Sequence, residues 1–211
     1  MGNIHYVVPA RKGSKGFPLK NRKLIKHLDC ESFKESLIVY SDDPWITNYC
    51  AEKSYKHVSR PSEVSLDETS PRDTLIRLCT DQCWSPNDTI VMLYLTYPGR
   101  TGDDIQNALD FYQTQELKSL LCRKELSVSP YLMMREGAES FKGEQLVKHD
   151  YYRRQDYPSC FEISHYVCIF QISELQKLNN NLYNRETAFF PIKDVIDVDA
   201  LKDYEKYKDN S

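Results

Sequence analysis

The sequence has no long hydrophobic run. Its longest apolar stretches, such as Thr89 to Leu95, are far shorter than the roughly 18 to 20 residues that a bilayer span needs. An apolar signal segment at the N-terminus is also lacking. Neither sign of charge is in large excess, because the sequence has 28 basic and 31 acidic residues and a net charge of -3. Such a chain has no overall field that draws it to nucleic acid or anionic lipid. We therefore expect a cytoplasmic protein that uses neither nucleic acid nor a membrane and that binds any anion locally.

No C-x-x-C pair occurs among the seven cysteines. An odd number of cysteines without a secretory signal indicates free thiols in a reducing compartment. Cys79 and Cys83 lie four residues apart and could share a helix face, but they have no companions with zinc-like spacing. We interpret both as buried core thiols.

Short apolar runs alternate with helix signals along the chain. The expected strands are Ile4–Val8, Leu37–Tyr40, Thr89–Leu95, Ser119–Cys122, Tyr131–Met134, His165–Ile172 and Ala188–Ile192. The expected helices are Trp45–Lys53, one capped by Thr69 or Ser70 that runs through Cys83, Asp103–Gln113 and one starting near Ala200. This alternation predicts one α/β domain over residues 1–211 with a mostly parallel sheet. Ligands bind such sheets at the carboxyl ends of the strands, where the loops after Val8 and Leu95 lie.

The regular pattern weakens from Leu117 onward. A polar, glycine-bearing stretch covers residues 135–145, and neither an internal repeat nor a low-complexity segment accompanies it. We expect an excursion from the domain here, in the form of a hairpin arm.

The loop after the first strand is basic and contains glycine. Its sequence, PARKGSKGFPLKN, holds Arg11, Lys12, Gly13, Ser14, Lys15, Gly16 and Lys20. Glycines let backbone amides point into a common concavity, arginine grips phosphate oxygens as a fork, and lysines and a serine hydroxyl add further donors. The loop matches neither the Walker motif nor G-x-G-x-x-G. A solvated basic loop without a ligand is the alternative, but the position directly after a strand favours a triphosphate site.

The pattern R-x-G-S-K-G-x-P-x-K-N resembles the signature loop of the acylneuraminate cytidylyltransferases, which activate sialic acids and related sugar acids. The resemblance implies a Rossmann-like nucleotidyltransferase domain, CTP as a substrate, and a homodimer whose dimerisation arm is residues 127–157. It also implies that the loop binds the triphosphate and stabilises charge in the transition state. The residues concerned are Arg11, Gly13, Ser14, Lys15 and Lys20, of which Arg11, Lys15 and Lys20 are the catalytic candidates, and Asn21 would fix the loop.

Two further segments extend the resemblance on the nucleotide side. Ser41 and Asp42 follow the second strand and look like the family's S-T/D-D segment. Arg60-Pro61, followed by Asp67 and Thr69, looks like the R-P-x-x-L-x-x-D-T stretch near the cytosine and ribose. The resemblance thus assigns Ser41, Asp42, Arg60 and Thr69 to the nucleotide. For Arg60, a purely structural arginine before proline is the alternative.

Three segments resemble the acceptor side of the family. LYLTYPGRT is similar to the family's L-L-Q-P-T-S-P-L-R-T but has Tyr94 where the family has a glutamine that faces the sugar, YYRRQDYP contains an R-Q motif, and Ser164-His165 stand where the family has N-G. The implied acceptor-binding residues are Tyr94, Thr96, Arg100, Arg154, Gln155, Ser164 and His165. A bidentate guanidinium suits a carboxylate acceptor. A structural role for His165 is the alternative.

The segment DVIDVDALKDYE places Asp197 and Asp199 two residues apart. In an extended chain, side chains at i and i+2 point to the same face, so both carboxylates can converge on one cation. Mg²⁺ prefers such hard oxygen ligands. The pair resembles the family's I-D-I-D-T motif and predicts a magnesium site. The alternative is that Asp199 caps a helix that begins at Ala200.

Together the motifs imply Mg²⁺-dependent transfer of CMP from CTP to a sialic-acid-like or other nonulosonic acid, with pyrophosphate leaving in an in-line displacement. Two alternatives remain open. The acceptor could be a different acid, Kdo-like or a phosphonate, because the acceptor motifs differ from the family pattern. The chain could also be a non-catalytic nucleotide-binding relative, because the stretch between Asn21 and Leu37 is short for the family.

Overall fold

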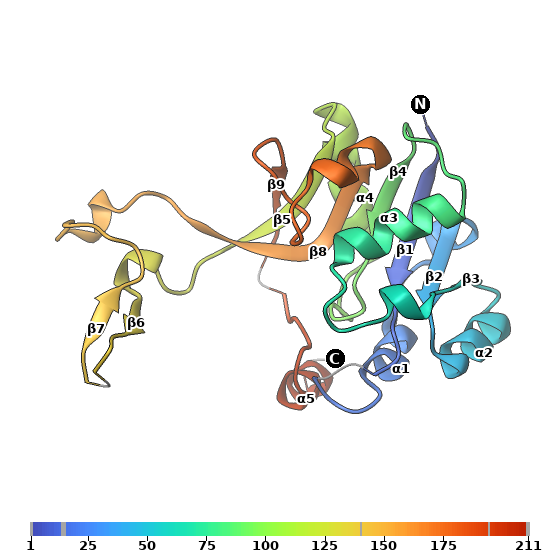
Figure 1. The fold of residues 1–211 in the computed structure, drawn as a ribbon, viewed down its shortest axis with the longest axis horizontal. Helices are drawn as coiled ribbons and strands as arrows, with labels where there is room; N and C mark the ends of the chain where they lie inside the picture. Colours follow the sequence, from blue (N-terminus) through green and yellow to red (C-terminus); the bar gives the residue numbers. More distant parts are fainter. Residues whose placement is uncertain (1, 14–15, 140, 194, 210–211) are drawn as a thin grey trace.

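A seven-stranded sheet forms the centre of the computed structural model, which describes residues 2–13, 16–139, 141–193 and 195–209 (Figure 1). The strand order is β3-β2-β1-β4-β8-β5-β9. The strands are β1 Ile4–Pro9, β2 Leu37–Ser41, β3 Lys56–Ser59, β4 Thr89–Met92, β5 Ser119–Glu125, β8 Phe161–Gln171 and β9 Ala188–Pro191. Only β8 runs antiparallel to its neighbours, and the other pairs are parallel. The expected α/β fold with a mostly parallel sheet is confirmed.

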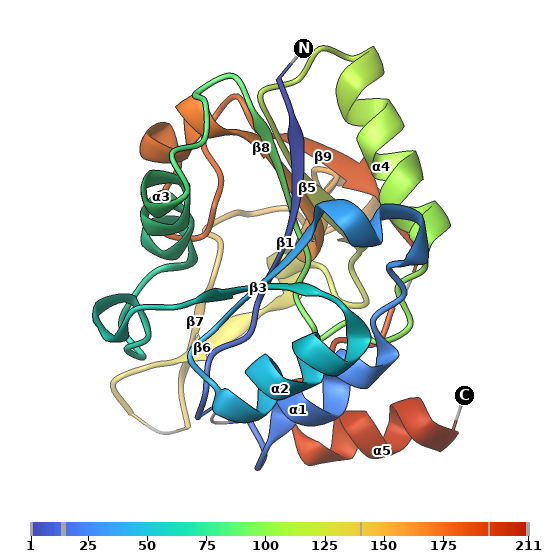
Figure 2. The same cartoon turned by 90° about the vertical axis from the view of Figure 1, so that its right-hand side faces the viewer.

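Helices cover both faces of this sheet (Figure 2). They are α1 Lys20–Leu24, α2 Pro44–Lys53, α3 Pro71–Asp81, α4 Gly102–Thr114 and α5 Leu201–Asp209. On one face α3 packs against Val7, and on the other α1, α2 and α4 pack against Val8. Both valines are fully buried, as expected for a parallel strand that is covered on each side.

The helix starts follow from local capping chemistry. Asp43 accepts a hydrogen bond from the amide of Trp45 at the start of α2, and Ser70 accepts one from Asp73 at the start of α3. At the start of α4, Thr101 and Asp104 form a reciprocal capping box. These starts agree with the predicted helices to within two residues.

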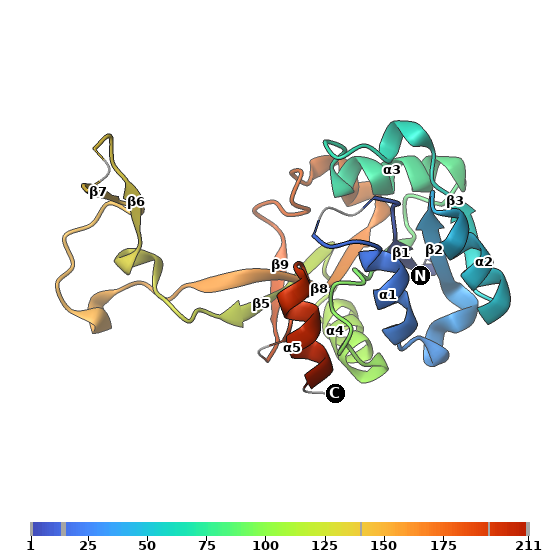
Figure 3. The same cartoon turned by 90° about the horizontal axis from the view of Figure 1, so that it is seen from below.

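The expected excursion is a hairpin arm that projects from the body between β5 and β8 (Figures 1 and 3). Its strands β6 Met134–Glu136 and β7 Gly143–Gln145 pair antiparallel. The predicted strand at Tyr131–Met134 is wrong, because residues 130–132 form a 3-10 turn that the Ser129 side chain caps. The arm exposes large apolar side chains, with Phe141 82% and Tyr152 87% exposed.

Sequence reasoning missed β3 and α1. Both are weakly apolar, since β3 is a half-exposed edge strand and α1 lies inside the basic loop region. Cys79 is buried as expected, and burial raises the pKa of its thiol to about 12. Cys83 is exposed, because α3 ends at Asp81 and the chain turns there with a φ of 52 at Cys83. In the described part of the chain, no helix is long and apolar enough to cross a membrane.

Candidate active site

A pocket of about 440 Å³ opens beyond the carboxyl ends of β1, β3 and β4. This is the edge at which ligands bind open α/β sheets. Ten of the residues predicted from sequence line it: Arg11, Lys20, Asn21, Arg60, Thr69, Tyr94, Thr96, His165, Asp197 and Asp199. The fold therefore brings the basic loop, the segment from Arg60 to Thr69, the acceptor segments at Thr96 and His165, and the aspartate pair to one cavity.

The basic loop is shaped by its glycines and by Asn21. Gly13 has a φ of +79, a conformation that glycine adopts at little cost. A Cβ on Gly16 would lie 1.8 Å from the carbonyl oxygen of Asp199, so only glycine permits this approach. The Asn21 side chain donates a hydrogen bond to the Arg11 carbonyl at 2.8 Å, which holds the loop as expected. The predicted residues Ser14 and Lys15 lie outside the described residues.

Ser41 and Asp42 lie behind the loop rather than in the pocket. The Ser41 hydroxyl is buried and donates to the carbonyl of Ala10, and the Asp42 carboxylate accepts a hydrogen bond from the amide of Lys12 at 2.6 Å. Neither residue lines the pocket. Both residues tie the loop to the end of β2, and their predicted contact with the nucleotide stays a prediction.

Arg60 follows β3 and is buried in the pocket wall. Its guanidinium donates to the carbonyl of Val64 and to the Thr74 hydroxyl, the latter at 3.1 Å, and burial lowers its pKa. The Thr69 hydroxyl donates to the carbonyl of Glu63 at 3.5 Å. Arg60 thus both lines the cavity and braces the turn that leads to α3.

The aspartate pair flanks a buried valine. Val198 is fully buried and its amide donates to the carbonyl of Thr96 at 2.7 Å, so the residues on either side face the pocket. The Asp199 carboxylate accepts a hydrogen bond from Nζ of Lys20 at 3.1 Å. The amide of Ala200 donates instead to Asp203, at 2.8 Å. Asp197 and Asp199 thus line one cavity and Asp199 contacts the basic loop, while their predicted binding of one cation stays a prediction.

Asp197 is the more deeply placed carboxylate. Its Oδ1 is buried and has no hydrogen-bond partner among the described residues. Burial raises the pKa of this carboxyl above its usual range, and the hydroxyls of Tyr97 and Thr96 act in the opposite direction. A buried carboxylate oxygen without a partner is expensive unless a ligand or cation satisfies it.

The side of the pocket that is predicted to bind the acceptor contains an aromatic pair. The rings of Tyr94 and His165 meet edge to face, with centroids 5.9 Å apart. Nε2 of His165 lies 3.1 Å from the carbonyl oxygen of Asn181. A carbonyl only accepts, so this nitrogen carries a proton. Burial raises the pKa of the Tyr94 phenol. The hydrogen bond to Asn181 thus orients the His165 ring, and Tyr94 packs against it.

Two predicted acceptor residues lie in the core instead. Ser164 is buried, with its hydroxyl 3.4 Å from the Tyr97 hydroxyl. Arg100 is 4% exposed and donates to the carbonyl of Tyr166 at 2.6 Å, and burial lowers its pKa to about 10. Neither lines the pocket. Their contacts are structural, since they join the segment after β4 to β8.

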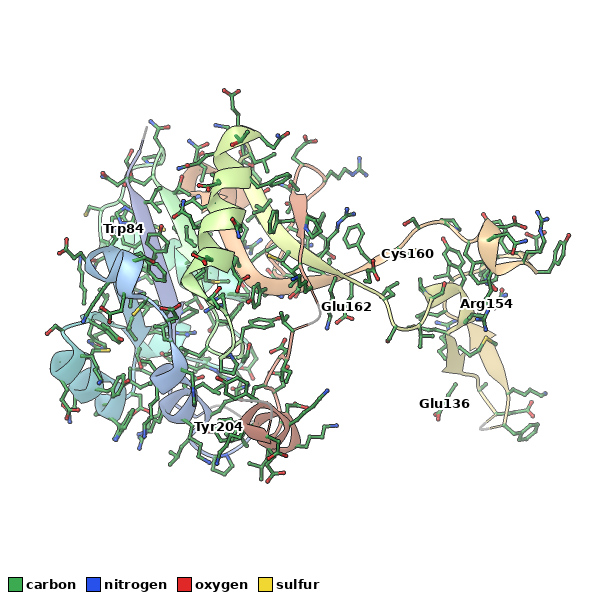
Figure 4. All side chains as sticks on the ribbon, turned by 180° about the vertical axis from the view of Figure 1, so that it is seen from behind. Trp84, Glu136, Arg154, Cys160, Glu162 and Tyr204 are labelled. Carbon is green, nitrogen blue, oxygen red and sulfur yellow. The ribbon has the colours of Figure 1, made fainter. Side chains whose placement is uncertain are left out.

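Arg154 and Gln155 form a 3-10 turn in the arm, and Figure 4 shows Arg154 well away from the body. They do not line the pocket of their own chain. Asp67, Tyr97 and Asn181 line it but were not among the predicted site residues. Asp67 lies in a recognised motif and forms an ion pair with Arg11, whereas no motif marks Asn181.

No family model matches the chain, but its sequence is similar to those of individual known proteins. Over 196 residues, the chain is 26% identical to N-acylneuraminate cytidylyltransferases of Streptococcus agalactiae serotypes V and III. These alignments cover 87% of this chain and 45% of each relative, so the chain spans less than half the length of the curated relatives it matches. The resemblance predicted from the motifs is confirmed.

Solved structures share the fold. A CMP:2-keto-3-deoxy-manno-octonic acid synthetase complexed with CTP superposes with a TM-score of 0.71 at 16% identity, covering 99% of this chain and 98% of the other. A 2-C-methyl-D-erythritol 4-phosphate cytidylyltransferase from Francisella tularensis gives a TM-score of 0.63 at 10% identity, covering 98% of each chain. This chain therefore shares the overall α/β fold of these two enzymes.

Proposed function

We propose that this chain transfers a cytidylyl group from CTP to an oxygen of a small acidic acceptor and releases pyrophosphate. We call the basic loop, residues 9–21, the phosphate loop. The observation that carries the proposal is the contact between Lys20 of this loop and Asp199 of the aspartate pair inside one pocket. The names of the similar proteins, which are cytidylyltransferases, support CTP as the nucleotide.

The proposal includes Mg²⁺ at Asp197 and Asp199. The unpartnered, buried Oδ1 of Asp197 and the neighbouring Asp199 carboxylate offer hard oxygen ligands. No group of three or more His, Cys, Asp or Glu side chains suited to a metal occurs among the described residues. A pair suits Mg²⁺, which commonly binds one or two carboxylates together with water and substrate phosphates. When bound, the ion would neutralise charge on the reacting phosphate.

The basic residues would hold the leaving pyrophosphate. Arg11 and Lys20 line the pocket next to the aspartate pair, and Lys15 belongs to the same loop. Both Arg11 and Lys20 form ion pairs with carboxylates, Asp67 and Asp199, which keep their side chains at the pocket. Catalysis would then rest on positioning and on stabilisation of developing negative charge.

The acceptor would bind against Tyr94, Thr96 and His165. Of the three described cations that line this pocket, Arg11 and Lys20 are assigned to the pyrophosphate, and Arg60 already donates to the Val64 carbonyl and the Thr74 hydroxyl. We therefore propose that the acceptor's carboxylate is read by Arg154 and Gln155 from the arm of a second copy, which makes the protein a homodimer. Apolar side chains exposed on the arm support this association. Light scattering tests the homodimer, and the KM for the acceptor tests the carboxylate contact, because an Arg154→Ala variant should remain dimeric yet lose acceptor affinity.

A panel of acceptors tests the function. The protein, CTP and Mg²⁺ are incubated with N-acetylneuraminate, another nonulosonic acid, a Kdo-like acid or a phosphonate, and pyrophosphate release and product mass are measured. One acid should give a CMP product. CTP binding without turnover of any acid would instead favour the non-catalytic alternative, and turnover of the Kdo-like acid or phosphonate alone would replace the sialic-acid-like acceptor.

A further inference from the structure

The helix α5 packs against the phosphate loop (Figures 1 and 2). The ring of Tyr204 stacks on that of Phe17, with centroids 5.5 Å apart. Phe17 is buried and lies between Gly16 and the start of α1. Nζ of Lys23 lies over both rings, 5.2 Å from the centroid of Phe17 and 5.8 Å from that of Tyr204. One aromatic pair with a shared cation therefore links α5 to the loop.

A second group of contacts anchors the next turn of α5. Tyr207 meets His27 edge to face at 5.3 Å, and its hydroxyl lies 3.4 Å from the carbonyl of Pro98. Pro98 belongs to the segment after β4 that also contains Thr96. The helix thus contacts the phosphate loop, the end of α1 and the segment after β4, three elements that meet around the pocket.

These contacts matter because α5 is short and lies on the surface. The helix has nine residues, and none of them is buried. Isolated helices of this length are marginal in water, so its order depends on tertiary packing. The aspartate segment leads directly into the helix, and Asp199 contacts both Gly16 and Lys20. Undocking of α5 would loosen the aspartate segment and the phosphate loop together.

We propose that α5 is a positioning element for the nucleotide and that Tyr204 is its key positioning residue. By stacking on Phe17, Tyr204 holds the phosphate loop against the aspartate segment in the arrangement that receives the triphosphate and its cation. This inference rests on the proposed function. Because coupling between sites is reciprocal, a nucleotide that bridges Lys20 and Asp199 must in turn stabilise the docked helix.

Three variants test the proposal: Tyr204→Ala removes the stack, Tyr204→Phe retains it, and Glu205→Ala changes an exposed neighbour on the same helix. Calorimetry with CTP and Mg²⁺ measures nucleotide affinity without turnover. We expect Tyr204→Ala to weaken CTP binding about tenfold, the size of a typical aromatic pair, and the other two to bind like the wild type. In steady-state assays the KM for CTP should rise, while the KM for the acceptor stays constant.

Hydrogen exchange gives a second readout. CTP and Mg²⁺ should slow amide exchange of residues 201–209 in the wild type and much less in Tyr204→Ala. Should Tyr204→Ala not fold, Tyr204→Leu keeps apolar cover without the stack and takes its place. The proposal would be overturned if a folded Tyr204→Ala or Tyr204→Leu variant bound CTP with wild-type affinity. It would also be overturned if CTP and Mg²⁺ did not change amide hydrogen exchange in α5 of the wild type. If CTP binding depends on the Tyr204 stack and CTP slows amide exchange in α5, but the wild type turns over no acceptor, only the proposed function would be overturned.

Discussion

A Cβ on Gly16 would lie 1.8 Å from the carbonyl oxygen of Asp199, so the phosphate loop and the aspartate segment touch through their backbones. The loop follows the first strand and the aspartates follow the last, and no sequence pattern predicts their contact. The loop that we propose to bind phosphate and the segment that we propose to bind the cation are therefore one packed unit.

Gly16→Ala should disrupt this unit, because the added methyl group would clash with the Asp199 backbone. Backbone atoms cannot move aside as the end of a flexible side chain can. We expect CTP affinity to fall at least tenfold while the unfolding midpoint changes little, since Gly16 itself is exposed. Gly99→Ala is the matched control, because its Cβ would lie at an ordinary 3.7 Å from the Tyr207 ring. Calorimetric titration with CTP compares the two. Equal affinities would show that the close contact does not shape the nucleotide site.

Asp197→Asn should separate stability from activity. Burial raises the pKa of this carboxyl, so the ionised form is disfavoured in the folded state and stability falls as pH rises from the unfolded value through the raised folded one. A neutral amide removes that penalty at pH 7. Without Mg²⁺, we expect a stabilisation of about 0.5–2 kcal/mol, or roughly 2–4 °C per kcal/mol in Tm.

The same variant should lose most Mg²⁺-dependent turnover, because an amide binds the ion less well than a carboxylate. Thermal unfolding with and without Mg²⁺, together with pyrophosphate release, provides the measurement. Asp103→Asn, which changes an exposed carboxylate on α4, serves as the comparison. Unchanged turnover in Asp197→Asn would remove Asp197 from the cation site.

Arg100→Ala tests the structural reading of Arg100. Its removal leaves a cavity and the Tyr166 carbonyl without its donor, which should lower the free energy of unfolding by about 2–4 kcal/mol. At temperatures where the variant is folded, the KM for the acceptor should not change. Urea denaturation and steady-state kinetics together decide this. A rise in acceptor KM with unchanged stability would return Arg100 to the acceptor site.

Asp88 forms an acid-sensitive contact with His5 at the end of the sheet away from the pocket. Burial opposes ionisation of Asp88, but hydrogen bonds from His5 and the amides of Asn3 and Ser85 hold the pKa of its carboxyl below the usual range. Its contribution to stability is therefore present above the unfolded pKa of about 3.9 and is lost as pH falls through the lower folded value.

Asp88→Asn should accordingly lower stability by about 1–3 kcal/mol at pH 7, and the difference from the wild type should shrink near pH 3. Urea midpoints at the two pH values give the answer. The exposed Asp81→Asn change supplies a control for general charge effects. A difference that persists undiminished at pH 3 would contradict this role of Asp88.

The sequence predicted the parts of the fold that local chemistry controls. Apolar runs located β1, β2 and β4, and caps such as Ser70 located the helices. Residues whose role depends on distant partners were harder to assign. Ser41 and Arg100 occur in motifs, but their hydrogen bonds go to the backbone, and only the packed fold reveals that. Asn181 reaches the pocket because the turn after β8 passes beside His165, a proximity that no local pattern encodes.

The most direct test follows the α-phosphorus of CTP. Protein, Mg²⁺ and CTP labelled at the α-phosphate are mixed with each acid of the panel, and the products are separated. The account predicts that the label joins one acid as a CMP ester in equal amount to the pyrophosphate released, and that Asp199→Asn abolishes this transfer. Label that stays in CTP with every acid, or that appears only as free CMP, would contradict cytidylyl transfer.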